Sequence, residues 1–296
     1  MTTARRFKGG LILIFLTLTA RMPLRFSRAI GRLLGWTALK LEIRSCKVAR
    51  TNLKHCFPDL GDRSRESILR GRMLHIGQML FETPRLWNRS ADWLQSHIVN
   101  VIGMDLFKKA LISNKGTVLL VPHQGNWEVV GLWIAKQTAI TSLYEPPKLR
   151  DLEDWIKTSR QKSGATLVPT NSRGVAALLQ ALKRGETIGI LPDQQPPANA
   201  GTFAPLFEKP AMTMTLVHKL LQRCDANVLF CTALRIRGGW SIHFTQSDPA
   251  IYSADQHVSV CALNRGVERI AELELSQYQW EYKRFRQQPE GLSSIY

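Results

Sequence analysis

The chain has 296 residues, of which 44% are hydrophobic, and it carries a net charge of +17. This length allows one large hydrophobic core but gives little support for two independent domains. The five cysteines are an odd number without a Cys-x-x-Cys pair, which excludes a disulfide framework and a zinc ribbon and suits a reducing compartment.

Most of the positive charge lies near the N-terminus. Residues 1–56 contain twelve Lys and Arg residues and a single acid, Glu42, and so carry +11 of the total charge. A surface this basic attracts nucleic acid, anionic lipid headgroups or an acidic protein. Because these basic residues flank an apolar segment, residues 11–20, the pattern favours a membrane as the partner and disfavours nucleic acid.

The apolar segment is too short to cross a bilayer, which needs about 20 residues. Its length fits a signal peptide, but the arginines that follow it favour retention on the cytoplasmic side. Residues 24–41 interleave apolar side chains with Arg and Lys, which is typical of a helix lying in an anionic membrane interface. We predict that residues 1–41 form a basic, hydrophobic membrane-anchoring segment and that residues 42–296 form the globular domain. A single span and a cleaved signal remain open.

Residues 42–98 are predicted to be mostly helical, with breaks at 57–59 and near Pro84. Strands and helices then alternate. Strands are predicted at 117–121, 139–144, 166–169 and 187–191, helices at 127–137, 149–162, 173–183, 211–222 and 258–275, and a strand pair at 227–236 and 240–245. This alternation predicts an α/β fold with a central mixed, largely parallel sheet that helices cover on both faces.

Two polar residues follow predicted strand ends. His123 comes after the strand at 117–121, and Asp193 comes after the strand at 187–191. Ligands of open α/β sheets bind at the carboxyl ends of the strands. We therefore expect both side chains to line one site.

The segment VPHQGNWE, residues 121–128, carries the candidate chemistry. If a helix begins at Asn126, a good N-cap, His123 lies in the preceding loop and Glu128 lies in the first turn. Glu128 would then accept a hydrogen bond from one ring nitrogen of His123 and leave the other free to take a proton from a hydroxyl. Gly125 permits close backbone approach, and amides near it are candidate oxyanion donors. The alternatives are a structural histidine and a glutamate placed by the helix dipole.

Other catalytic motifs are absent from the sequence. It has no H-E-x-x-H, no G-x-S-x-G, no phosphate-binding P-loop and no G-x-G-x-x-G. No Cys or His cluster offers metal ligands, and no activated Ser or Cys lies near His123 in sequence. We predict neither a metal nor a cofactor.

The spacing H-x4-E after a buried strand resembles the lysophospholipid acyltransferase superfamily. Further segments narrow the resemblance to the bacterial lipid A late acyltransferases, in the same order along residues 45–288: RTNLKHCFPDL, VPHQGNWE, RGETIGILPDQ, FEKPAMT and YQWEYKRFR. One departure is Glu208-Lys209, where the family often has a glycine-containing turn.

This resemblance implies a glycerolipid acyltransferase-like fold for residues 42–296. It implies transfer of a fatty acyl group from acyl carrier protein to a hydroxyl of a 3-hydroxyacyl chain on a lipid A precursor, at the cytoplasmic face of the bacterial inner membrane. A related enzyme that acylates a glycerophospholipid or an aminoacyl lipid is the alternative, and a non-catalytic basic lipid- or nucleic-acid-binding protein is a further one.

The resemblance also assigns residues. It makes His123 the catalytic base and Glu128 its partner, and it places Arg160 and Asp193 in the active site. Arg173 lies at a helix start, where the dipole disfavours a cation, and this hints at a ligand contact. Gly125 and Asn126 complete the predicted substrate-binding set.

Overall fold

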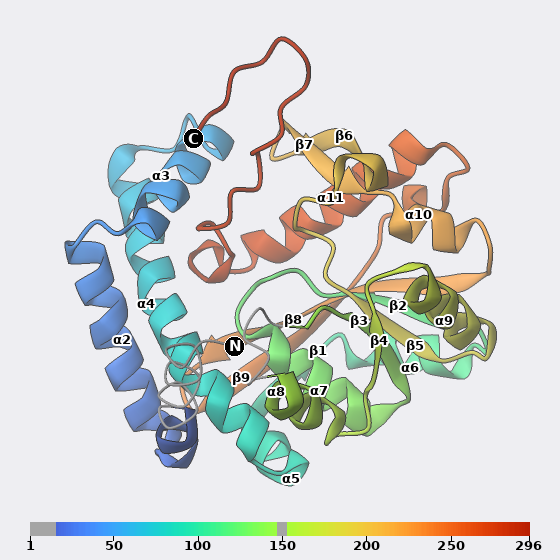
Figure 1. Cartoon of the computed structure of the whole chain (residues 1–296), viewed down its shortest axis with the longest axis horizontal. Coiled ribbons are helices and arrows are strands. Elements are labelled where there is room, and N and C mark those ends of the chain that lie inside the picture. The colour runs from blue at the N-terminus through green and yellow to red at the C-terminus, as the bar shows by residue number, and fades with distance from the viewer. Residues whose placement is uncertain (1–15, 147–152) are drawn as a thin grey trace, which may run out of the picture.

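The computed structural model describes residues 16–146 and 153–296, and within them it shows a seven-stranded sheet (Figure 1). The strand order is β1-β9-β8-β2-β5-β3-β4, and every neighbouring pair is parallel except β8 with β9. The bounds are β1 Ile98–Ile102, β2 Gly116–Leu120, β3 Ile140–Tyr144, β4 Thr166–Pro169, β5 Thr187–Ile190, β8 Ala226–Ile236 and β9 Gly239–Gln246. The predicted mixed, largely parallel sheet is confirmed.

Helices cover both faces of this sheet. They are α6 Met104–Ile112, α7 Trp127–Gln137, α9 Ser172–Lys183 and α11 Gln256–Glu272. Alternate residues of the central strand β2 point to opposite faces. Val118 and Leu120 join the core beneath α9 and α11, and Leu119 joins the core beneath α6 and α7. Since β2 is buried on both faces, its continuous apolar run is explained.

Three further helices, α2 Leu24–Lys40, α3 Arg44–Cys56 and α4 Asp62–Asn88, lie together along one side of the molecule (Figure 1). α2 packs against α4 through glycines. A Cβ atom added to Gly31 or Gly77 would overlap the backbone of the other helix, so the two helices approach more closely than larger residues would allow. The break at residues 57–59, between α3 and α4, is confirmed.

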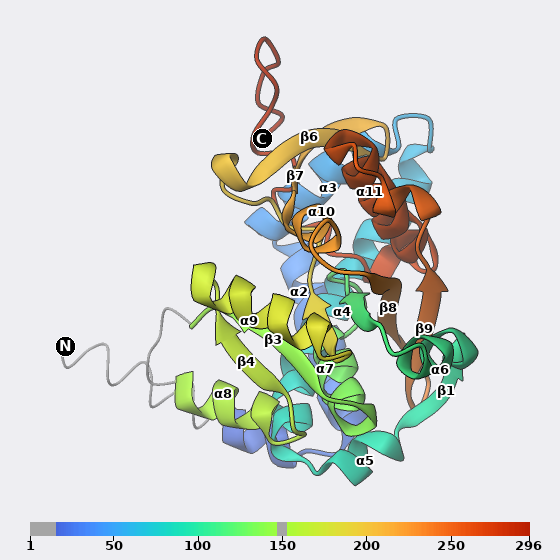
Figure 2. The same cartoon turned by 90° about the vertical axis from the view of Figure 1, so that its right-hand side faces the viewer.

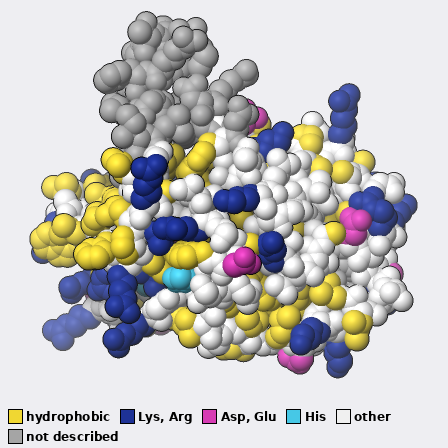
Figure 3. Space-filling model, turned by 90° about the horizontal axis from the view of Figure 1, so that it is seen from below, with side chains coloured by type: hydrophobic (Ala, Val, Ile, Leu, Met, Phe, Trp, Pro, Cys, Tyr) yellow, Lys and Arg dark blue, Asp and Glu magenta, His cyan; other side chains and the backbone are white. Residues whose placement is uncertain are grey.

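The outward face of α2 is hydrophobic. The helix buries its small residues Ser27, Gly31 and Gly35 and exposes large apolar side chains instead. The exposed set includes Phe26, Ile30, Leu33, Leu34 and Trp36. Hydrophobic side chains gather at one side of the surface, beside a group of basic ones (Figure 3). Within the two described ranges, no helix is both long and apolar enough to cross a bilayer. The first half of the apolar segment 11–20 falls outside those ranges.

The structure corrects three predictions about local structure. α4 continues through Pro84 to Asn88, because Glu82 and Leu86 on either side of the proline are buried and hold the last turn in place. β1 and α6 occupy a region for which no elements were predicted. The helix predicted at 211–222 is instead the end of strand β7, Lys209–Met214, followed by the short helix α10, Leu216–Leu221.

The missed strand is half of a hairpin. β6, Gly201–Leu206, pairs antiparallel with β7 beside α11 (Figure 2). The two linking residues, Phe207 and Glu208, have φ angles of 49° and 62°. Two consecutive residues in the left-handed conformation form the two-residue turn that suits a hairpin. Glycine or asparagine is the usual residue at these two positions. The turn expected from the family pattern is therefore formed here without glycine.

A buried carboxylate joins the N-terminal helices to the sheet. Glu82 on α4 is fully buried and accepts hydrogen bonds from Arg28 on α2 and from Arg235 on β8. Removing it would leave two guanidinium groups in the interior without their counter-charge. We expect Glu82→Ala to lower the free energy of unfolding by about 3–5 kcal/mol, measured by urea denaturation.

The matched control is Glu186→Ala, which removes a carboxylate from the exposed pair with Arg184. That change should cost at most about 1 kcal/mol. Equal destabilisation by the two variants would contradict the importance of the buried contact.

Candidate active site at the carboxyl edge of the sheet

The loops that follow β2 and β5 carry the candidate residues. These two strands are parallel neighbours, and Leu120 is paired with Ile190 at their carboxyl ends. His123 and Asp193 each lie three residues beyond these paired positions. The two side chains therefore meet at one edge of the sheet, as predicted from their positions after strand ends.

Asp193 holds His123 through both of its carboxylate oxygens. Its Oδ1 lies 2.8 Å from Nδ1 of the His123 ring, and its Oδ2 accepts a hydrogen bond from the His123 backbone N–H, also at 2.8 Å. Both residues are buried, with 8% of His123 and 3% of Asp193 exposed. These contacts fix the position and the orientation of the imidazole.

The carboxyl of Asp193 stays ionised in this setting. Burial alone would raise its pKa, but the attraction of His123 and the hydrogen bonds from His123 outweigh burial and hold the pKa below its ordinary value. The negative charge of Asp193 also affects the neighbouring Tyr278. Burial and the neighbouring Asp193 raise the pKa of the Tyr278 hydroxyl well above its ordinary value, so this hydroxyl remains protonated.

The second ring nitrogen of His123 faces an amide. Nε2 lies 3.2 Å from the side-chain nitrogen of Gln194, which also donates to Oε1 of Gln279 at 3.0 Å. An amide nitrogen can only donate, so Nε2 acts as the acceptor and the ring proton lies on Nδ1, facing Asp193. The lone pair on Nε2 is the one available to take a proton.

Glu128 does not contact His123 in the predicted way. The nitrogens of Arg160 donate to both of its carboxylate oxygens, with Nε 3.0 Å from Oε2, and the indole N–H of Trp87 donates to Oε2 at 2.9 Å. The prediction that Glu128 accepts the hydrogen bond from the His123 ring is therefore wrong. The first turn of α7 directs Glu128 towards α8, Glu153–Gln161, which carries Arg160, while the loop turns His123 towards β5.

Gly125 and Asn126 fix the course of the loop. Gly125 has a φ of 60°, and an added Cβ would overlap the carbonyl of Ala233 on β8. The backbone amides of Gly125 and Asn126 already donate to the carbonyls of Gln277 and Ala233, each at 3.0 Å, so these amides are not free to serve as oxyanion donors. Asn126 occupies the N-cap position of α7, but its side chain donates to Glu82 and caps nothing.

An apolar cavity of about 290 Å³ opens beside these residues. Trp127, Glu128 and Arg160 contribute to its lining, and the ring of Trp127 packs against that of His123 with centroids 4.8 Å apart. The remaining wall contains two polar residues, Ser142 and Glu145, and is otherwise apolar: Gly131, Leu132, Ile140, Leu143, Ala165, Leu167 and Leu191. The cavity is at the small end of the range for ligand pockets and has the usual mixture of an apolar wall and a few polar groups.

Comparisons with known proteins identify the family of the chain. A family model described as "Bacterial lipid A biosynthesis acyltransferase" matches residues 3–287. The chain belongs to this family. It is 26% identical to both the lipid A biosynthesis palmitoleoyltransferase and the lauroyltransferase of Escherichia coli K12, over 95% of this chain and 92% of each relative. The myristoyltransferase of the same organism is 24% identical over 92% of this chain and 84% of its own length.

This lipid A family acyltransferase thus unites His123 with Asp193 and Glu128 with Arg160, as two separate pairs. Arg173 is exposed in the first turn of α9, and its side chain makes no hydrogen bond or ion pair within the described residues. Gln194 and Trp87 contact the two pairs but were not singled out from the sequence. Gln194 directly follows Asp193 and ends the segment RGETIGILPDQ, but the sequence does not indicate that its side chain contacts His123.

Metal ligands do not gather anywhere in the part of the acyltransferase that the structure describes. No group of three or more His, Cys, Asp or Glu side chains converges there.

Proposed function

We propose that this acyltransferase moves a fatty acyl group from acyl carrier protein to a hydroxyl of a 3-hydroxyacyl chain on a lipid A precursor. The family and the names of the E. coli relatives support the lipid class. The observation that carries the chemistry is the hydrogen bond between Nδ1 of His123 and Asp193, which leaves Nε2 as an acceptor beside the apolar cavity. A buried base held in one tautomer suits the activation of a hydroxyl.

In the proposed reaction, the acceptor hydroxyl takes the place of the Gln194 amide at Nε2 of His123. Nε2 removes the hydroxyl proton while the oxygen attacks the thioester carbonyl, and Asp193 stabilises the imidazolium that forms. The tetrahedral intermediate then breaks its C–S bond. The thiolate of the carrier's phosphopantetheine leaves and receives the proton from Nε2, which restores the neutral ring. Acyl transfer is direct, with no acyl-enzyme intermediate, metal or cofactor.

Glu128 enters the proposal through Arg160. The two hydrogen bonds hold the guanidinium at the rim of the cavity, where its charge would stabilise the oxyanion of the tetrahedral intermediate. Glu128 is then a positioning residue for Arg160, and Asp193 is the positioning residue for His123. Gly125 and Asn126 shape the loop between the two pairs.

The cavity next to the two pairs would hold the acyl chain. Apolar side chains from α7, β3 and β4 line it together with Trp127, Glu128 and Arg160. A chain whose thioester lies at His123 would extend along this wall and bury its methylenes, each contributing about 0.8 kcal/mol.

The membrane partner is proposed from the surface of α2. Large apolar side chains project from this helix beside arginines, which is how a helix binds in the interface of an anionic membrane. We propose that this surface holds the acyltransferase at the cytoplasmic face of the bacterial inner membrane, within reach of both substrates. The overall positive charge would also attract the acidic carrier protein, and the exposed Arg173 is one candidate contact.

Mass spectrometry of lipid A from a strain that lacks the gene tests this proposal. The mutant should lack one secondary acyl chain, and the wild-type gene should restore it. If lipid A is unchanged and a glycerophospholipid or aminoacyl lipid loses a chain instead, the acceptor has been assigned to the wrong lipid class.

A further inference from the structure

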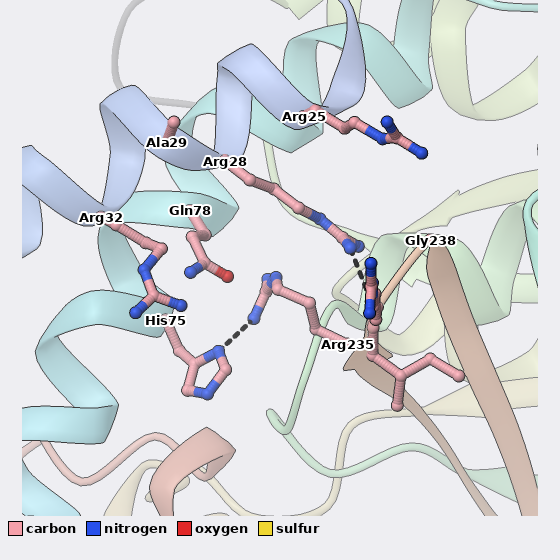
Figure 4. Close-up of a pocket in the computed structure, with 10 residues that line it drawn as sticks. Arg25, Arg28, Ala29, Arg32, His75, Gln78, Arg235 and Gly238 are labelled. Atoms are coloured by element: carbon pink, nitrogen blue, oxygen red, sulfur yellow. Dashed lines mark hydrogen bonds between the residues drawn. The ribbon is translucent and has the colours of Figure 1, made fainter.

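A cleft of about 700 Å³ lies between α2, α4 and the turn that joins β8 to β9, apart from the cavity beside His123 (Figure 4). Five arginines line it, three from α2 and two from the end of β8 and the turn that follows: Arg25, Arg28, Arg32, Arg235 and Arg237. The only carboxylate that pairs with any of them within the described residues is Glu82, behind Arg28 and Arg235. The cleft therefore keeps a large excess of positive charge.

The free cations are at the mouth of the cleft. Arg28 and Arg235 are engaged by Glu82, and Arg28 also donates to the carbonyls of Ile236 and Gly239. In contrast, the guanidinium groups of Arg25, Arg32 and Arg237 have no ion pair or hydrogen bond in the part of the chain that the structure describes. They are exposed, so each keeps its donors for an outside ligand.

The buried wall of the cleft also has a free polar group. Gln78 on α4 is only 4% exposed, yet its side-chain amide has no hydrogen-bond partner among the described residues, and it is directed into the cleft (Figure 4). His75 beside it accepts a hydrogen bond from Arg235 at 2.9 Å. Burial and the charges of Arg235 and Arg72 lower the pKa of His75 to about 3, so this ring is neutral and the positive charge of the cleft comes from its arginines.

We propose that this cleft binds the phosphate monoester of a membrane-embedded phosphorylated lipid. Guanidinium groups match phosphate oxygens with paired donors, and three free arginines supply more donors than a single carboxylate could use. The apolar side chains that α2 exposes, such as Phe26 and Ile30, lie on the same helix as Arg25 and Arg32. A ligand with a phosphate in the cleft and apolar chains along α2 satisfies both features, whereas the acidic helix of a carrier protein would leave the apolar face exposed.

The cleft is linked to the candidate active site through one side chain. Glu82 pairs with Arg28 and Arg235 on one side and accepts a hydrogen bond from Asn126, in the loop of His123, at 3.2 Å on the other. A lipid phosphate in the cleft would therefore position an acceptor lipid relative to His123. This last step rests on the proposed function, but phosphate binding itself does not.

Vesicle sedimentation without any acyl donor tests the proposal. Wild-type protein is mixed with vesicles that contain phosphatidic acid, a phosphate monoester, or phosphatidylglycerol, a diester, at matched surface charge. The wild type should prefer phosphatidic acid by about tenfold, as expected for charge-assisted hydrogen bonds to the additional charge. The triple variant Arg25→Gln/Arg32→Gln/Arg237→Gln should bind both vesicles equally.

A second triple variant, Arg63→Gln/Arg223→Gln/Arg286→Gln, is the matched control, since it removes the same charge from exposed arginines outside the cleft. It should keep the preference for phosphatidic acid. The proposal is overturned if the wild type shows no preference, if the cleft variant keeps it, or if both triple variants lose it equally.

Two competition arms identify the source of the phosphate. Millimolar inorganic phosphate should not release the wild type from phosphatidic acid vesicles, because it lacks the apolar part of the ligand. Release would assign the cleft to a free anion. Acyl carrier protein should likewise leave the vesicle binding of the wild type unchanged. If the carrier displaces the wild type from the vesicles but does not displace the cleft variant, the cleft binds the carrier. If no acyl transfer is ever found but the vesicle preference holds, only the proposed function fails.

Discussion

Replacing His123 with alanine should reduce acyl transfer by about 1,000-fold or more while leaving the fold unchanged. The variant loses the imidazole whose Nε2 is the proposed proton acceptor. It should not unfold, because Asp193 can rebind water in the space that the imidazole leaves at the edge of the sheet. Transfer is measured with purified protein, labelled acyl carrier protein and the lipid acceptor, and the fold by circular dichroism and melting temperature.

The matched control is His257→Ala. This histidine is exposed on α11, and its removal should leave the rate within about twofold of the wild type, as is usual for surface positions. If the His123 variant keeps near-wild-type transfer, the reaction does not depend on this imidazole as its base.

Asp193→Asn should lower the turnover rate by about 100- to 10,000-fold with little change in the KM for either substrate. An asparagine amide can still hold the backbone N–H of His123, but it cannot stabilise the imidazolium as a carboxylate does. It can also donate to Nδ1 and so favour the tautomer that carries its proton on Nε2. The effect should therefore fall on the chemical step.

The pH dependence of this defect follows from the Asp193 carboxyl. Its pKa is held below the ordinary value, so the carboxylate is fully ionised at neutral pH and loses its charge only as the pH falls below about 4. The charge that Asp193→Asn removes should therefore be the same throughout pH 6 to 8. The contact of ionised Asp193 with His123 also stabilises the fold. This stabilisation is complete when the pH is above the ordinary pKa of an aspartate, and it is lost as the pH falls through the lowered pKa of Asp193 in the folded protein.

Glu128→Gln is the comparison that separates the two pairs. Glutamine keeps one acceptor for Arg160 or Trp87 but loses the charge that holds the guanidinium at both oxygens. We expect a smaller loss of turnover than in Asp193→Asn. The reverse order would show that the pair of Glu128 with Arg160 contributes more to turnover than the contact of Asp193 with His123.

Much of the sheet was predictable because its strands are short apolar runs with clear boundaries. β2 lies between Lys115 and Pro122, and β5 lies between Gly185 and Pro192, so both were located. The hairpin of β6 and β7 was not, because Phe207 and Glu208 adopt left-handed conformations that these residue types rarely have. Pro84 suggested a break, but tertiary contacts of Glu82 outweighed the missing backbone donor.

The sequence predicted which loops form the site, but it did not predict which side chains form hydrogen bonds there. Positions after two strand ends correctly brought His123 and Asp193 together, because parallel neighbours end at one edge. Sequence proximity wrongly suggested Glu128 as the hydrogen-bond partner of His123. That choice depends on how the first turn of α7 faces Arg160, a residue more than 30 positions away, and local spacing does not contain this information.

The nitrogen NMR spectrum of the His123 ring, in protein labelled at histidine and assigned with the His123→Ala variant, tests the central claim most directly. The account predicts a neutral ring with its proton on Nδ1 and an unprotonated Nε2. This state should persist in Glu128→Gln and change in Asp193→Asn. A wild-type ring with its proton on Nε2, or a tautomer that responds to Glu128 and not to Asp193, would contradict the assignment of Asp193 as the partner of the base.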